Sequence, residues 1–235
     1  MVASHEHVIE NRLLSKLPPE VRERLRPQLE TVKFSLGQVI YESGGRMKHV
    51  YFPTTSHISL LYTMIDGSTA EMGLVGNEGV VGIALFMGGE TTPNRAMVQG
   101  AGVAFRLKAK GMLDEFKRGG EFQHVMLRYT QALITQISQT AVCNRLHSVE
   151  QRLCRWLLMT RDRTGSDELQ MTHEFISNML GVRREGVTLA AKRLQELGMI
   201  SYVRGHIIIL DRQQLLERVC ECYQVVKDEH KRLLG

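Results

Sequence analysis

The segment from Met171 to Asp211 constrains the fold of this 235-residue chain more than any other. Thr172 can cap a short helix, HEFISNML, and Gly181 stands where a helix commonly ends in a left-handed conformation. A second helix is expected to open at Arg183 and to stop at Gly198. Its apolar positions form one stripe that should face a core. They are Val187, Ala190, Ala191, Leu194 and Leu197.

Two short apolar runs follow this second helix. They cover residues 200–203 and 206–209, and Arg204-Gly205 between them suits a tight hairpin turn. Two helices separated by a turn and followed by a hairpin predict a winged helix-turn-helix, whose second helix fits the major groove of B-DNA. The alternative is a helical pair that only packs the chain and carries solvated charges.

Charged residues gather where the second helix of this segment begins. Arg183 and Arg184 can offer a guanidinium fork to guanine, and Glu185 can accept a hydrogen bond from a cytosine amine. We therefore expect these residues to read bases. Other candidate DNA contacts lie on the two helices and the wing, within reach of phosphate oxygens. They are Thr172, His173, Thr188, Lys192, Arg193 and Arg204.

The first half of the chain has a different pattern. Residues 8–30 predict short helical pieces, broken by prolines at positions 18, 19 and 27. Over residues 32–107, short apolar and β-branched runs alternate with glycine turns, which favours a β-sandwich or barrel. The clearest hairpin covers residues 59–75, with Asp66-Gly67 at its turn.

A long helix is expected next, because no proline or glycine interrupts residues 122–144. One stripe recurs at helical spacing and comprises Phe122, Met126, Tyr129, Leu133 and Ile137. A second face repeats every seven residues, at Leu127, Ile134 and Ala141. One stripe can pack on the barrel and the other on a second copy, so we expect a homodimer through the 120–144 helix. A long helix packed within one chain is the alternative.

Residues 148–162 predict a further helix, with Ser148 and Gln151 as a capping box. The following residues 163–170, RTGSDELQ, are expected to form a surface turn. The predicted fold is α+β. It has an N-terminal β-barrel with short helices over residues 1–110, a dimerisation helix over 111–146 and a C-terminal winged helix-turn-helix over 147–235.

Net charge is +5, which permits a polyanionic partner without requiring one. The positive excess is spread over both halves of the chain, so only local placement of charge supports a nucleic-acid contact. No run of residues is long and apolar enough for a membrane span. The N-terminal MVASHEHVIENRLL has no apolar signal core, and we expect a cytoplasmic protein.

Four cysteines are present, Cys143, Cys154, Cys220 and Cys222, and none forms a C-x-x-C pair. A zinc or iron–sulfur site with the usual paired spacing is therefore not visible, and we expect no metal site. Cys220 and Cys222 lie on an expected helix, where their side chains would diverge by roughly 200°. Buried, inert thiols are the expectation, and a redox role for one of them stays open.

The order of parts resembles the CRP/FNR family of bacterial transcription regulators. The resemblance is most specific in ISNMLGVRREGVTLAAKRLQELGMI, which matches the family's Leu-Gly, Arg-Glu-x-Val and Leu-x-x-Leu-x-x-x-Gly-[Leu/Met]-Ile pattern. FSLGQVIYESGG and HVYFPTTSHISLL look like the family's early strands, with His57 where glycine is usual. The resemblance implies a double-stranded jelly-roll barrel and no enzymatic activity. It also implies a homodimer on a two-fold DNA site and contact with RNA polymerase.

The chain departs from the family in residues 80–99, VVGIALFMGGETTPNRAMVQ. The family's cyclic-nucleotide binders carry Gly-Glu-[Leu/Ile], whose Glu binds the ribose, and then Arg-[Ser/Thr]-Ala, which binds the phosphate. Here the matching residues are Gly82-Ile83-Ala84 and Asn94-Arg95-Ala96. The arginine is either displaced by one position or replaced by Asn94, and no hydroxyl residue follows it. The hydroxyls that face the nucleobase would fall near Ile137-Ser138, where one is missing. Loss of the ribose acceptor and of the phosphate clamp together costs on the order of a thousandfold or more in affinity. We expect no control by cyclic AMP, and Gly82, Ile83, Asn94, Arg95 and Ala96 stay candidates for another ligand.

The favoured function is a sequence-specific DNA-binding regulator that acts as a homodimer on an inverted repeat. A regulator whose barrel binds another small ligand or cyclic nucleotide is the alternative. A nucleotide-sensing module that controls a protein partner is a further alternative. It would need an intact nucleotide-binding motif and no DNA-binding helix, which is the opposite of what this sequence shows. An iron–sulfur cluster of the family type needs N-terminal cysteines, which are absent. Haem sensing through His49 or His57 stays open, and a metalloenzyme would need a glutamate that these histidines lack.

Overall fold

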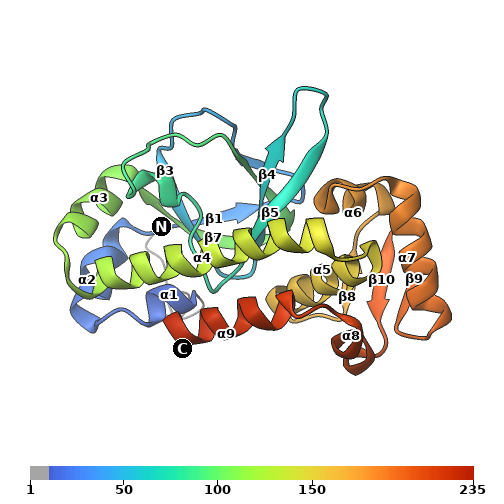
Figure 1. Cartoon of the computed structure of the whole chain (residues 1–235). Coiled ribbons are helices and arrows are strands. Elements are labelled where there is room, and N and C mark those ends of the chain that lie inside the picture. The colour runs from blue at the N-terminus through green and yellow to red at the C-terminus, as the bar shows by residue number, and fades with distance from the viewer. Residues whose placement is uncertain (1–10) are drawn as a thin grey trace. The chain divides into compact units, whose positions relative to one another are not determined.

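The computed structural model describes residues 11–235 (Figure 1). By their contacts, these residues divide into two compact units. The first unit comprises residues 11–60, 73–134 and 230–235, and the second comprises residues 61–72 and 135–229. Residues 1–10, where the expected 1–110 domain begins and where we expect no secretion signal, lie outside the described residues.

Short helical pieces open the first unit, as the prolines predict. They are α1 (Arg12–Ser15), α2 (Pro19–Leu25) and the 3-10 turn η2 (Arg26–Gln28). The buried side chain of Asn11 caps α1, because its oxygen accepts hydrogen bonds from the Leu13 and Leu14 amides at 3.1 and 3.2 Å. Its amide nitrogen donates to the Pro53 and Gly79 carbonyls at 2.8 and 3.0 Å. One buried amide therefore caps the helix and also binds the end of a strand at Pro53 and a loop at Gly79, both in the same unit.

The strands of the first half form two sheets, in the orders β1-β7-β3 and β2-β6-β4-β5. Their bounds are β1 (Glu30–Phe34), β2 (Val39–Tyr41), β3 (His49–Pro53), β4 (His57–Thr63), β5 (Thr69–Val75), β6 (Arg95–Gly100) and β7 (Gly102–Lys108). Phe52, Ile58, Val98 and Phe105, drawn from both sheets, are fully buried. The expected β-rich domain is confirmed, and residues of both sheets supply its core.

The hairpin between β4 and β5 turns where the sequence predicts. Gly67 adopts φ +83°, a left-handed conformation that glycine reaches without strain. The Asp66 carboxylate accepts from the Ser68 amide at 3.0 Å and from its hydroxyl at 2.7 Å. These two hydrogen bonds hold the pKa of Asp66 below its usual value.

Two helices follow the strands, α3 (Ala109–Lys117) and the long α4 (Gly120–Leu146). The expected apolar stripe of α4 is buried at Phe122, Met126, Tyr129 and Leu133 and half-buried at Ile137. On the second face, Leu127 and Ile134 are 48% and 51% exposed, and Ala141 is exposed as well. The two predicted faces are thus present, and the second has no cover among the described residues.

Helix α5 (Val149–Thr164) begins with the predicted capping box, in which Ser148 and Gln151 exchange hydrogen bonds. The prediction of a surface turn over residues 163–170 is wrong at both ends, because α5 extends to Thr164 and a strand covers the last three residues. Residues Glu168–Gln170 form strand β8, which pairs antiparallel with β10 (His206–Ile209). The strand forms because its central side chain, Leu169, is buried.

The winged helix-turn-helix is confirmed as an element order. It comprises α6 (His173–Leu180), α7 (Arg184–Glu196), β9 (Ile200–Val203) and β10, and its sheet has the order β8-β10-β9. Val187, Ala190, Ala191 and Leu194 are buried, as the stripe predicts. The prediction fails at Leu197, which is 44% exposed, because α7 ends at Glu196 and the chain leaves the helical phase there.

The chain ends in α8 (Arg212–Arg218) and α9 (Cys222–Leu234). The expectation that Cys220 and Cys222 share one helix is wrong. Val219 adopts an extended conformation with ψ 150°, so α8 stops and Cys220 lies in the connection before α9. The helical divergence of the two thiols therefore does not apply. No helix of the described residues is long and apolar enough to cross a bilayer.

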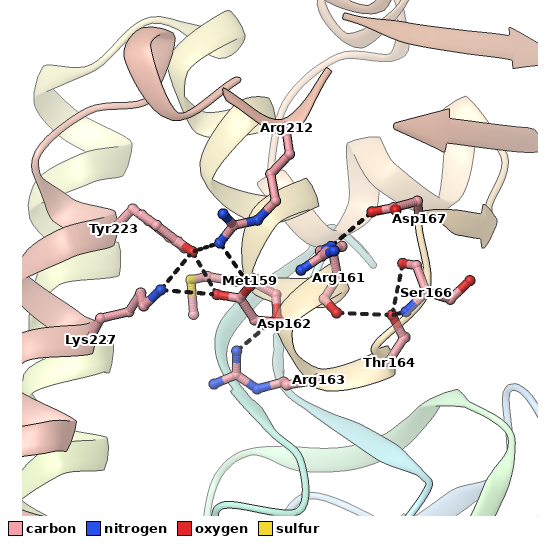
Figure 2. Close-up of polar contacts among 10 residues, drawn as sticks. All are labelled: Met159, Arg161, Asp162, Arg163, Thr164, Ser166, Asp167, Arg212, Tyr223 and Lys227. Carbon is pink, nitrogen blue, oxygen red and sulfur yellow. Dashed lines mark hydrogen bonds and ion pairs between the residues drawn. The ribbon is translucent and has the colours of Figure 1, made fainter. Parts of the chain in front are cut away.

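Figure 2 shows how α9 is held against α5 and α8 by the carboxylate of Asp162. The Tyr223 hydroxyl donates to Asp162 at 2.6 Å, and the Arg212 and Lys227 cations lie 3.5 and 3.7 Å from the same carboxylate. Burial, together with the hydrogen bond to Asp162, raises the pKa of Tyr223. Helix α9 thus has a polar anchor whose partners all come from the second unit.

Candidate nucleic-acid interface

The first helix of the interface starts and stops at the residues that the sequence indicates. The Thr172 hydroxyl accepts from the Phe175 amide at 3.1 Å and so caps α6. Gly181 adopts φ +60° and ends this helix. Arg183 is the extended N-cap of α7, with φ −68° and ψ 144°. The turn of residues 181–183 therefore fixes where α7 begins.

The three expected base readers stand at the N-terminal end of α7. Arg183, Arg184 and Glu185 are all exposed. Within residues 11–235, no side-chain hydrogen bond or ion pair engages any of the three. The unsatisfied amides of a helix N-terminus also favour an anion nearby. Two exposed guanidinium groups without a partner in residues 11–235 thus belong to the N-cap and the first residue of α7, at the positive end of the helix.

His173 lies at the junction of α6, α7 and the wing. Its Nδ1 is 3.1 Å from the Thr188 hydroxyl, and its ring stacks on Tyr202 at 4.0 Å between centroids. Burial, followed by the charge of Arg184, lowers the pKa of His173, because both disfavour the charged ring. Thr188 also donates to the Arg184 carbonyl at 3.0 Å. Through these contacts, His173 and Thr188 can hold α6, α7 and the wing in their relative positions. Sequence reasoning missed Tyr202, because its partner His173 is 29 positions away.

The remaining basic candidates differ in how far other groups engage them. Lys192 lies 3.7 Å from Glu196, and both are well exposed. Arg193 pairs with the half-buried carboxylate of Glu150 at 3.2 Å, and Arg218 pairs with the same carboxylate. Arg193 therefore helps to join α7 to α5 and α8, which its position in the sequence does not reveal.

The wing ends in an exposed arginine. Arg204 and Gly205 adopt φ +48° and +85°, the two left-handed residues of a tight hairpin turn. No ion pair engages Arg204 in the described part of the chain. A cation at this turn is free to meet a phosphate.

In the first unit, the glycine-rich loop contacts β3 at one end. Gly82 adopts φ +104°, and a Cβ there would lie 3.2 Å from a Val50 methyl group and 3.4 Å from the His49 carbonyl. Ile83 follows at the start of a 3-10 turn, η3 (Ile83–Leu85). An apolar, half-buried side chain thus stands beside the glycine, in the position where the family's nucleotide binders carry a carboxylate.

The other end of the loop contacts β2. The Tyr41 hydroxyl donates to the Asn94 side chain at 3.0 Å, and Ala96 is buried opposite Tyr41. The Arg95 guanidinium lies 3.5 Å from the carboxylate of Glu42. The loop therefore still carries an arginine, Arg95, but the Glu42 carboxylate of the same unit already lies beside it.

The two histidines of the haem hypothesis sit on strands. The His57 ring packs over Gly100, where a Cβ would lie 1.8 Å from a ring carbon, so glycine is needed to make room for it. His57 is buried, and a packing role accounts for its place in β4. Burial, followed by the charge of Arg106, lowers the pKa of His49.

Comparison with known domains matches both halves of the chain. The cyclic nucleotide-binding domain matches residues 31–118, and the Crp-like helix-turn-helix domain matches residues 151–218. No curated protein matches the chain.

Solved structures with the same fold are numerous. A CRP/FNR-family transcriptional regulator from Eubacterium rectale has a TM-score of 0.68 at 17% identity, over 88% of this chain and 96% of its own. FixK2 from Bradyrhizobium japonicum has a TM-score of 0.70 at 15% identity, over 82% and 98%. The c-di-GMP responsive global regulator CLP from Xanthomonas campestris has a TM-score of 0.69 at 13% identity, over 83% and 100%.

The two matched domains occur in the order that the fold shows, with the long α4 between them. The similar structures share this fold over more than four fifths of the chain. The chain belongs to the CRP/FNR family of DNA-binding transcription regulators.

Proposed function

We propose that this protein is a sequence-specific regulator that binds an inverted-repeat DNA site as a homodimer, without control by cyclic AMP. The observation that carries the proposal is the N-terminal end of α7. It presents exposed Arg183, Arg184 and Glu185, with no intramolecular partner in residues 11–235, from a winged helix-turn-helix. A helix of this kind enters the major groove with its N-terminal residues at the base edges.

Base reading falls to Arg184 and Glu185, with Arg183 beside them. A guanidinium can donate to both acceptors of guanine, and a carboxylate can accept from the cytosine amine. Phosphate contacts fall to Arg204, Lys192 and the α6 N-terminus at Thr172. Arg193 can contribute a further phosphate contact, for which its guanidinium would have to leave Glu150 or be shared with it.

The homodimer proposal rests on α4. Leu127, Ile134 and Ala141 repeat every seven residues on an exposed face, and a seven-residue apolar repeat packs against a matching helix. A second copy of the same chain offers that helix, with two-fold symmetry. Two symmetric readers then require a DNA site with two-fold symmetry. We also propose contact with RNA polymerase, and this part of the proposal rests on the family resemblance alone.

Independence from cyclic AMP rests on the glycine-rich loop. A cyclic phosphate would have to displace Glu42 from Arg95, and Ile83 cannot accept from a ribose hydroxyl. A different small ligand is the second candidate. A cavity of about 240 Å³ in the first unit is lined by polar side chains that include Tyr41, Arg46 and His49.

Selection of binding sites from a random DNA pool tests the proposal. Purified protein, with no nucleotide added, is expected to enrich an inverted repeat whose half-sites are about one helical turn apart, or a small multiple. Equal binding to all sequences would contradict it, as would a strict need for cyclic AMP.

The double variant Leu127→Glu/Ile134→Glu tests the dimer. We expect it to sediment as a monomer and to lose the inverted repeat, because charges on the α4 face cannot be buried against a second copy. Leu36→Glu is the matched control, since Leu36 is exposed and lies outside α4. A double variant that stays dimeric would place the dimer contact elsewhere.

A further inference from the structure

Four metal-binding side chains converge where α4 ends and α9 begins. The sulfurs of Cys143, Cys220 and Cys222 and a ring nitrogen of His147 all lie within 4.8 Å of one another. The three cysteines are buried, and the histidine side chain is only 15% exposed. All four residues belong to the second unit.

The spacing of these atoms suits a single tetrahedral ion. The Cys143 and Cys220 sulfurs are 3.6 Å apart, and the Cys222 sulfur is 3.6 Å from Nδ1 of His147. Zinc bonds of about 2.3 Å to sulfur and 2.0–2.1 Å to nitrogen place tetrahedral ligands about 3.8 Å apart for two sulfurs and about 3.6 Å for sulfur and nitrogen. The chain therefore holds the ligand atoms near the required separations.

Local backbone structure explains the convergence. Cys143 and His147 are one helical turn apart, and the His147 amide donates to the Cys143 carbonyl at 3.1 Å. The extended Val219 ends α8, so Cys220 lies outside a helix and Cys222 begins α9. Two ligands thus come from the end of α4, one from the α8–α9 connection and one from the first residue of α9.

The outer ring nitrogen of the histidine is held as well. Nε2 of His147 lies 3.4 Å from the Glu221 carboxylate, while Nδ1 faces the thiols. A metal-ligating histidine almost always donates its other N–H to a carboxylate, carbonyl or water, which fixes the tautomer and the ring. Glu221 sits between the two cysteine ligands of the connection, so the same short segment supplies this partner.

The surroundings supply positive charge. Arg152 and Arg155 of α5 are both more than nine-tenths buried, and their Nε atoms have no hydrogen-bond partner in the described residues. Arg155 donates to Thr140, which lies one turn before Cys143 on α4. Three thiolates and one divalent ion sum to a single negative charge, which buried guanidinium groups would offset.

We propose that Cys143, His147, Cys220 and Cys222 bind one zinc ion as a closed, structural Cys₃His site. Four protein ligands leave no position for water, so the ion joins α4 to the α8–α9 connection and does no chemistry. An iron–sulfur cluster fits less well, because its ligands bind separate irons and lie farther apart. A Cys143–Cys220 disulfide would use two of the residues and leave Cys222 and His147 unexplained.

Metal analysis of the purified full-length chain tests the proposal. We expect about one zinc per chain, and neither iron nor acid-labile sulfide. Cys220→Ser and Cys222→Ser are expected to lose the zinc. Cys154→Ser is the matched control, because Cys154 is equally buried but outside the cluster, and burial raises its pKa to about 12. Iron with sulfide, a metal-free native protein with a Cys143–Cys220 disulfide, or zinc retained by Cys220→Ser would overturn the proposal.

Cobalt substitution keeps the test decisive if a serine variant fails to fold. Cobalt added to the chelator-treated wild-type chain should give the visible absorption of a tetrahedral thiolate complex. His147→Cys should still bind one ion, with a cobalt spectrum shifted by the fourth thiolate. An octahedral cobalt spectrum, or no cobalt binding by a folded chain, would overturn the site. DNA binding is assayed separately, so the result leaves the proposed function untouched.

Discussion

The N-terminal end of α7 and the glycine-rich loop of the first unit each set an arginine close to a glycine turn, with opposite results. Arg184 is exposed and has no partner in residues 11–235. Arg95 is 31% exposed and faces Glu42 at 3.5 Å. An unpaired surface cation is available to a polyanion, whereas a paired one must first give up its carboxylate. This difference supports the proposal that DNA meets the N-terminal end of α7 and that the glycine-rich loop does not bind a cyclic phosphate.

Arg184→Ala should have the largest effect on this comparison. Loss of a bidentate base contact costs about 1–3 kcal/mol, so we expect affinity for the selected site to fall by roughly 5- to 150-fold. Discrimination against single-base changes at the contacted position should weaken as well. Titration of matched and mismatched duplexes measures both, with Lys33→Ala, at an exposed position of β1, as the control. Undiminished discrimination would remove Arg184 from base reading.

Arg204→Ala should have a smaller and more uniform effect. The wing arginine is expected to meet a phosphate, so its loss should weaken all sequences alike. The slope of log affinity against log salt should fall by about one. Binding at several salt concentrations gives that slope. A change in sequence preference would mean that the wing reads bases.

Arg95→Ala should have the smallest effect. If the loop is structural, DNA affinity should change by less than about twofold, and cyclic AMP should not alter the melting temperature of the wild-type chain. Thermal melting with cyclic AMP, cyclic GMP and cyclic di-GMP measures the second part. A large change in DNA affinity would show that Arg95 still serves a ligand.

The winged helix-turn-helix could be predicted from sequence because its signals are local. Thr172, Gly181 and Gly205 each fix a cap or a turn through their own backbone and immediate neighbours. The stripe of α7 was predicted except at Leu197, where the helix ends one residue before the stripe does.

The features that sequence reasoning missed depend on distant partners. β8 has only three residues, and it forms because β10, more than 35 positions away, pairs with it. The stack of His173 on Tyr202 is of the same kind. Neither partner leaves a mark within the short window that propensity and periodicity use.

The thiol cluster was missed for two reasons, an unused local signal and a wrong assumption about helix continuity. Cys143 and His147 at i and i+4 were a local signal that could have been noticed. The assumption of one continuous helix over Cys220 and Cys222 hid the other half. Val219 breaks that helix without proline or glycine, so no strong breaker marks the position.

The closeness of Cys143 and Cys220 has a consequence for the unfolded chain. They are 77 positions apart, and α5, the helix-turn-helix, the wing and α8 all lie between them. A link between the two sulfurs, through an ion or directly, would close a loop of the chain that contains the whole winged helix-turn-helix. In the chain-entropy model, such a closure lowers the conformational entropy of the denatured chain, and this stabilises the folded state by about 4–5 kcal/mol. The DNA-binding part of this protein would then owe part of its stability to a cross-link outside its own hydrophobic core.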